Sequence, residues 1–133
     1  MKQLRGQSAR VALVAAAAML VMGGCSTNPA TGQRQFSLIG EQQEIALGQE
    51  EAASAVAQLG RYDDAELQAY VSGVGNRLAA ATEKPDLPWS FTVVDDPVVN
   101  AFALPGGPIF VTRGILTHFN SAAELAAVLG HEI

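Results

Sequence analysis

Two short strand-like stretches on either side of a Pro-Gly-Gly turn constrain the fold more than any other feature of this sequence. Residues 89–96 read "WSFTVVDD" and begin with alternating apolar and polar side chains, as a half-buried strand does. Residues 108–112 read "PIFVT" and form a second apolar stretch directly after two glycines. Helical patterns surround this pair. The order of elements therefore predicts an α+β fold, with helices packed on a small antiparallel sheet.

Three longer segments carry apolar side chains at helical spacing: 41–60, 63–82 and 120–133. Acidic residues load the first turn of the first segment, and Gly60 is suited to end it. Either Asp63 or Asp64 can cap the second helix. In the third segment Ser121 and Glu124 have the spacing of a capping box.

The first 24 residues have the order of a secretion signal. A basic segment is followed by the apolar run "VALVAAAAMLVM", which is too short for a comfortable membrane span, and then by "GGC". This order resembles a lipobox, in which cleavage before Cys25 leaves an N-terminal cysteine that carries acyl chains and anchors the protein to a membrane. Ser26 after the cysteine favours the outer membrane. A plain secretory signal and an uncleaved anchor helix are the alternatives.

Charge is distributed unevenly along the chain. Three of the eight basic residues and no acidic residue lie in positions 1–24, so the net charge falls from −5 to −8 without them. An acidic body argues against nucleic acid as a partner. The polar, Pro- and Gly-containing stretch 25–40 is expected to be a flexible tether, and 41–133 to be the N-terminal part of one domain.

The sequence ends shortly after the pair His131–Glu132. In an H-E-x-x-H helix, residues four apart share a face, so two imidazoles can bind one metal ion with the glutamate beside the metal-bound water. His-Glu alone also occurs by chance, and a lone histidine on a helix is more often structural or solvent-exposed. The pair therefore needs support from its context.

That context is the segment "VVNAFALPGGPIFVTRGIL" followed by a capped helix ending in "AAVLGHE". From about Tyr70 to Ile133 the chain resembles peptidase family forty-eight. This gluzincin family includes the CAAX prenyl protease, Oma-type mitochondrial proteases and periplasmic lipoprotein proteases of bacteria. The resemblance implies that His131 is the first ligand of one Zn²⁺ ion and that Glu132 is the general base.

The resemblance also implies an edge strand that pairs with extended polypeptide substrates over the active-site cleft. The residues to which it gives this substrate-binding role are Gly107, Pro108, Ile109, Phe110 and Val111. A tight hairpin turn without any contact to substrate is the plainer interpretation of the glycines.

We expect the sequence to be the N-terminal part of a longer protein, interrupted inside the H-E-x-x-H motif and inactive by itself. The longer protein would be a membrane-tethered zinc endopeptidase of the bacterial periplasm that cleaves misfolded or misassembled envelope proteins. A non-catalytic lipoprotein that binds or chaperones envelope partners on the same scaffold is the alternative. A small structural lipoprotein would require the match to be coincidental.

Replacement of Cys25 by alanine tests the lipoprotein interpretation. The Cys25→Ala protein should move to the soluble envelope fraction or remain an uncleaved precursor, because stable anchoring needs the multiply acylated cysteine. Cell fractionation and the mass of the mature protein measure both results. A variant that is processed and membrane-bound like the original would show that the lipobox interpretation is wrong.

Overall fold

The structure is a computed structural model that describes residues 25–27, 34–36 and 40–133. The predicted signal peptide, residues 1–24, lies outside the described residues, as does most of the predicted tether. In the part of the chain that is described, no helix has the length and apolar character needed to cross a membrane.

The chain divides into two compact units, residues 1–40 and residues 41–133. In the first unit, β1 (Cys25–Thr27) pairs antiparallel with β2 (Arg34–Phe36). These two strands fall within the predicted tether. The second unit contains all the elements described below.

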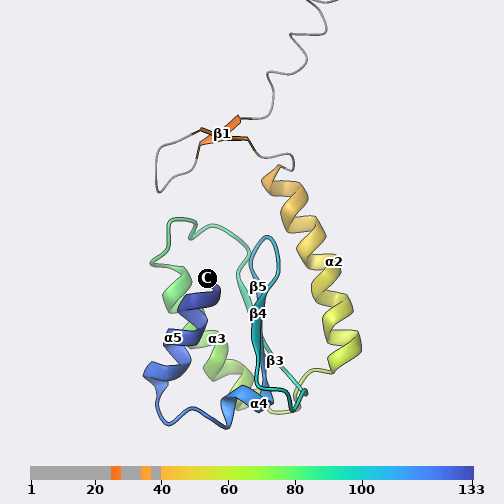
Figure 1. Cartoon of the computed structure of the whole chain (residues 1–133), viewed down its shortest axis with the longest axis vertical. Helices are drawn as coiled ribbons and strands as arrows, with labels where there is room; N and C mark the ends of the chain where they lie inside the picture. The colour runs from red at the N-terminus through yellow and green to blue at the C-terminus, as the bar shows by residue number, and fades with distance from the viewer. Residues whose placement is uncertain (1–24, 28–33, 37–39) are drawn as a thin grey trace, which may run out of the picture. The chain divides into compact units, whose positions relative to one another are not determined.

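The second unit packs helices on both faces of a sheet (Figure 1). Its elements in chain order are α2 (Glu41–Leu59), α3 (Ala65–Ala79), β3 (Ser90–Val94), β4 (Ala101–Ala103), β5 (Pro108–Thr112), α4 (Arg113–Leu116) and α5 (Ala122–Glu132). Helix α2 lies on one side of the sheet, and α3 and α5 lie on the other. The predicted α+β class is confirmed.

The sheet has three strands in the order β3-β5-β4 and is mixed. Strand β5 is parallel to β3, with Ser90 opposite Pro108, and antiparallel to β4, with Ala101 opposite Val111. The prediction of an antiparallel sheet is therefore wrong for one of the two pairings. The physical reason is that β3 and β4, although consecutive in sequence, do not pair, because β5 lies between them.

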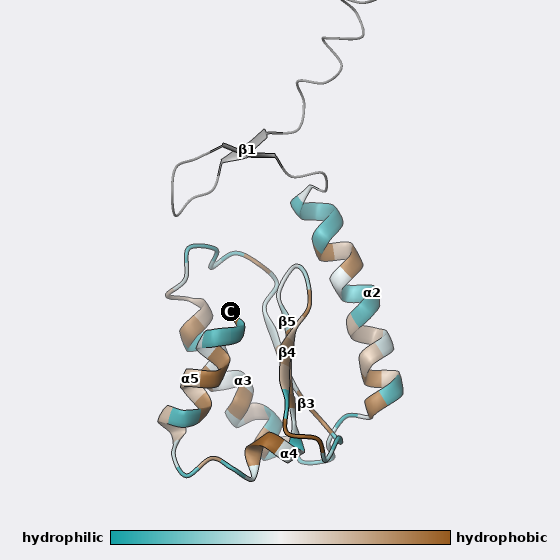
Figure 2. Ribbon diagram, in the orientation of Figure 1, coloured by the Kyte–Doolittle hydropathy of each residue, from teal (hydrophilic) through white to brown (hydrophobic). Residues whose placement is uncertain are grey.

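The core lies between the sheet and the two helices on its α3 and α5 face, where Figure 2 shows apolar segments facing one another. Its buried side chains are Val71, Val74, Ala79, Phe91, Val93, Ile109, Val111, Leu125 and Leu129. Complete burial of one large aliphatic side chain contributes about 1.5–3 kcal/mol. This layer is therefore the main source of stability for the positions of α3 and α5.

Local signals set the helix ends. The side chain of Asp64 accepts a hydrogen bond from Leu67 N at 2.9 Å, and Ser121 Oγ accepts one from Glu124 N at 3.3 Å. The Glu124 carboxylate reaches back to the backbone N of Asn120 at 2.7 Å, one residue before the position expected for a capping box. Gly60 follows α2 with a φ of 74°, a conformation that ends helices.

Helix α3 approaches β3 closely at Gly75. This glycine is buried, and a Cβ built on it would overlap the ring of Phe91. Gly73 lies on the same helix with more room, since the nearest atom to its Cβ would be Arg77 Nη1 at 3.7 Å. Both glycines lie in the interior of α3, but only Gly75 is packed tightly against a neighbouring element.

This difference predicts opposite effects of alanine. Gly75→Ala should lower the free energy of unfolding by about 1–3 kcal/mol, because Phe91 must move in a filled core. Gly73→Ala is the matched control and should raise it by up to about 1 kcal/mol through helix propensity. Urea denaturation midpoints measure both. Equal stability of the two variants would contradict the close approach of α3 to β3.

Candidate active-site groove

Helix α5 carries His131 and Glu132 on its last turn. Leu125 and Leu129 on this helix are buried, and because residues four apart share a face, this pair fixes the rotation of the helix. Val128 and His131 lie three apart on a neighbouring face. The side chain of His131 is exposed, and that of Glu132 is half-buried. Packing of the leucines thus sets the rotation of α5 that leaves His131 exposed and Glu132 half-buried at the end of the helix.

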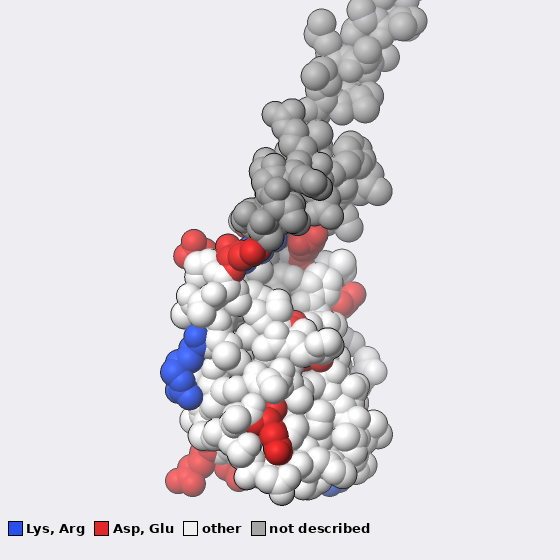
Figure 3. Space-filling model, turned by 60° about the vertical axis from the view of Figure 1, so that its left-hand side comes forward, with Lys and Arg blue, Asp and Glu red and all other residues white. Residues whose placement is uncertain are grey.

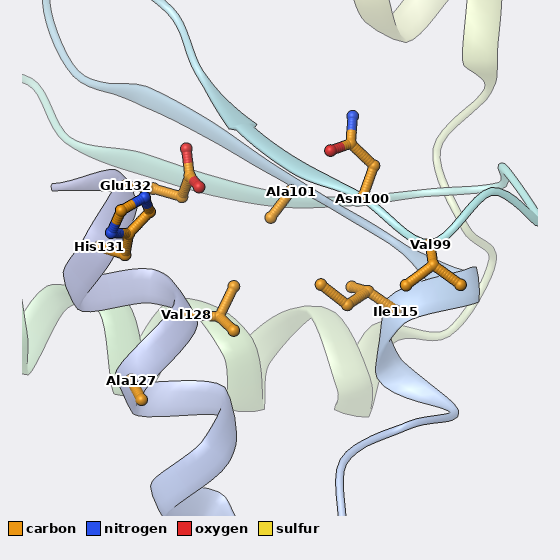
Figure 4. A pocket seen from close by; sticks show the side chains of 8 residues that line it. All are labelled: Val99, Asn100, Ala101, Ile115, Ala127, Val128, His131 and Glu132. Carbon is orange, nitrogen blue, oxygen red and sulfur yellow. The ribbon is translucent and has the colours of Figure 1, made fainter.

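A groove with a cavity volume of about 400 Å³ lies between α5 and the segment that leads into β4. It is lined by Val99, Asn100, Ala101, Ile115, Ala127, Val128, His131 and Glu132. In Figure 4 the side chains of Ala101, Ile115 and Val128 point into the groove, whereas the amide of Asn100 points away from it. His131 and Glu132 lie at one end (Figure 4). The groove therefore combines an apolar lining with one imidazole and one carboxylate.

The outer edge of β4 borders this groove. The backbone O of Asn100 accepts a hydrogen bond from β5 at 3.1 Å, and the backbone N of Leu104 donates one to β5 at 2.8 Å. Hydrogen-bonded positions alternate in an antiparallel pair, so Ala101 and Ala103 direct their backbone N–H and C=O groups away from β5. These outward groups can pair with a further extended chain.

The outer edge of β3, in contrast, is covered. Tyr62 N donates to Val93 O at 3.0 Å. The side chain of Gln68 donates to Val93 O at 2.9 Å and accepts from Val93 N at 3.0 Å, as a neighbouring strand would. Ser72 Oγ donates to Phe91 O at 3.0 Å. Of the two sheet edges, the one beside His131 is therefore the one available for pairing.

The family resemblance implies substrate contacts for Gly107, Pro108, Ile109, Phe110 and Val111. The expectation that this segment is an edge strand over the cleft is wrong, because β5 is the central strand and has β3 and β4 on its two edges. All five residues are buried, and none of them lines the groove. The edge position belongs to β4, one strand earlier in the sequence.

The donor atoms for a metal are incomplete in the described residues. In 25–27, 34–36 and 40–133, no three side chains of His, Cys, Asp or Glu come together in a way that could hold a metal ion. A catalytic zinc site uses about three protein ligands and an open position for water. His131 offers one exposed imidazole, and His118 does not line the groove. These residues alone therefore do not fit a complete zinc site.

Of the apolar side chains that line the groove, Val128 has a signal in the sequence, since it lies on the inward face of the last helical segment, three residues before His131. Val99 and Ile115 carried no such signal, because their place in the groove depends on how β4 and α4 are packed.

The face of the molecule seen in Figure 3 is largely uncharged, with scattered acidic side chains and a few basic ones. The whole sequence has 13 acidic and 8 basic residues.

Comparison with known families gives one match. The sequence model of peptidase family M48 matches residues 64–133, just over half of the chain. The matched region begins at the cap of α3 and includes every residue that lines the groove.

Curated relatives fall into two groups. The chain is 49% identical over 55 residues to "Mitochondrial metalloendopeptidase OMA1" of Arabidopsis thaliana, covering 41% of this chain and 11% of the relative. It is 37% identical over 71 residues to "Putative beta-barrel assembly-enhancing protease" of Vibrio cholerae, covering 53% and 15%. It is 30% identical over 105 residues to "Beta-barrel assembly-enhancing protease" of Yersinia pestis, covering 79% and 22%. The chain thus spans between about a tenth and about a fifth of the length of these relatives.

Proposed function

We propose, from the premise that this chain belongs to peptidase family M48, that it forms the part of a zinc-dependent endopeptidase that holds the first metal ligand and the general base. In this proposal His131 is the metal ligand and Glu132 is the base. The substrate is a polypeptide, bound between α5 and the edge of β4.

The observation that carries the proposal is the position of His131 and Glu132 at the end of a groove whose other wall is an open strand edge. Peptide hydrolysis needs the scissile bond held next to a base. An extended peptide that adds to the edge of β4 runs past the last turn of α5, where these two side chains lie.

The chemistry assigned to this chain is proton transfer. A zinc ion, when bound, supplies a Lewis acid beside which water loses a proton more readily. In this proposal the carboxylate of Glu132, which lines the groove, accepts a proton from the attacking water and passes it to the leaving amine. His131 has no role in proton transfer in this scheme.

Substrate selection in the proposal rests on the backbone. The outward N–H and C=O groups of Ala101 and Ala103 recognise the main chain of a peptide, which is the same in every sequence. Such recognition favours extended or unfolded segments and tolerates many side chains. This tolerance supports a role in the removal of misfolded or misassembled proteins.

The bacterial envelope is the proposed place of action. The leader sequence before Cys25 supports secretion and lipidation, and the relatives from Vibrio cholerae and Yersinia pestis are named as proteases that enhance beta-barrel assembly. The mitochondrial relatives share the peptidase family, so the leader favours the envelope over an organelle. An acylated Cys25 would tether the domain at the membrane, with residues 25–40 as the spacer.

Replacement of the proposed base tests the mechanism. Glu132→Gln in the full-length protein should lower kcat on an unfolded substrate such as casein about a hundredfold or more, because the amide cannot accept the proton. Bound zinc should remain. Glu124→Gln is the matched control on the same helix, at the N-terminal end and outside the lining of the groove, and should keep full activity. Unchanged turnover in Glu132→Gln would remove this residue from the mechanism.

The metal requirement gives a second test. We propose that the remaining ligands come from residues that follow Ile133 in a longer protein, so residues 25–133 alone should neither bind zinc tightly nor cleave peptides. A calorimetric zinc titration of residues 25–133, with His131→Ala as the control, measures the binding. Tight binding of one zinc ion that depends on His131, together with chelator-sensitive cleavage, would show that these residues already complete the site.

A further inference from the structure

The hydroxyl of Thr112 joins three segments beside the groove. Thr112 ends β5 and is 1% exposed. Its Oγ1 lies 2.6 Å from Val98 O and 2.8 Å from Asn100 O, and the single hydroxyl hydrogen is shared between these two acceptors. The same oxygen accepts from Asn100 N at 3.2 Å and from Ile115 N at 3.3 Å. One side chain thus ties the segment before β4 and the start of α4 to the central strand.

The other attachments of this segment are through its backbone: Thr112 N donates to Asn100 O at 3.1 Å, and Gly114 packs closely against Pro97 O and Val98 O. Val98 and Val99 are 59% and 56% exposed, so burial of their side chains contributes little to keeping them in place. The side chain of Asp96 accepts a hydrogen bond from Val98 N at 2.9 Å, at the outer end of the segment. Next to the groove, the hydroxyl of Thr112 is therefore a main restraint on residues 98–100.

Residues 98–100 determine the geometry of the groove wall that leads into the outer edge of β4. Val99 lines the groove, and Asn100 leads directly into Ala101, whose backbone groups are the first of β4 to face outward. Ile115, whose backbone N–H donates a hydrogen bond to the same hydroxyl oxygen, lines the groove from α4. A displacement of residues 98–100 would move the groove wall and the start of the strand edge together.

We propose that Thr112 is a positioning residue for peptide binding, whose hydroxyl holds residues 98–100 so that Val99 and the outer edge of β4 meet the substrate in one geometry. This inference rests on the proposed peptidase function. Thr112 itself is buried and does not touch the substrate. It acts through the backbone of Val98, Asn100 and Ile115.

Valine has nearly the shape of threonine and lacks the hydroxyl, so Thr112→Val removes these bonds while the core remains filled. The backbone groups of Val98 and Asn100 belong to exposed residues and can bind water instead. Loss of the hydroxyl should therefore release this segment without unfolding the domain. Thr112→Ser restores the hydroxyl and serves as the rescue variant.

The first measurement is steady-state cleavage of an extended peptide by the full-length protein. Thr112→Val should raise KM about fivefold to tenfold, the effect of losing about one net hydrogen bond, with kcat within about twofold of the original. A change in KM alone marks the loss of binding that is equal in the ground and transition states. Thr112→Ser should restore KM. Thr92→Val, on β3 opposite Phe110, is the matched control and should leave KM unchanged.

The second measurement does not depend on activity. Backbone hydrogen exchange by mass spectrometry should become faster over residues 97–104 in Thr112→Val and stay unchanged over α3. If the original protein has no peptidase activity, the proposed function fails, while the exchange pattern still tests the positioning role. An unchanged KM in an active Thr112→Val protein, or exchange that rises equally over α3 and residues 97–104, would overturn the inference.

Discussion

The pairing of β5 on both of its edges is the constraint on which the rest of the structure depends. Five consecutive residues of this strand are buried, with Ile109 and Val111 in the core beneath α3 and α5. Phe110 alternates to the other face and stacks on Phe102, with ring centroids 5.1 Å apart. Because β5 is paired on both edges and buried on both faces, the positions of its two ends are fixed. The turn from β4 enters one end, and α4 begins at the other.

The groove results from two independent restraints that meet. The rotation of α5 is set by leucines packed in the core, and the place of β4 is set by hydrogen bonds to β5. Neither restraint involves His131 or Glu132, so the reactive side chains contribute little to the fold that presents them. His131 is exposed and Glu132 is half-buried, which agrees with a separation between the residues that build the fold and the residues proposed for the chemistry.

Local signals in the sequence predicted the three long helices and the strands β3 and β5, but they did not predict β4 and could not predict the order of the strands. Asp64, Ser121 and Gly60 act within a few residues of themselves, and the structure confirms a cap or a helix end at each. The edge of β3 is covered by Gln68, which lies 25 positions from its partner Val93. No short-range pattern shows such a contact, so the sequence left open which strand is central. The same limit applies to the groove: a motif could indicate His131 and Glu132, whereas Val99 and Ile115 enter only through tertiary packing.

The cover that α3 gives to β3 also bears on how copies of this domain can associate. Sheets of separate molecules join through strands whose backbone groups are unpaired, and repeated joining at two opposite edges produces fibres. In residues 41–133, Gln68 and Ser72 occupy backbone groups of β3 that such joining would need. Two copies that met through β4 would use up the open edge of each three-stranded sheet, and a third copy would find no free edge on these two sheets. The asymmetry between the two edges therefore limits growth of this sheet by strand pairing to a closed pair, and in a single molecule it leaves one edge open to a peptide.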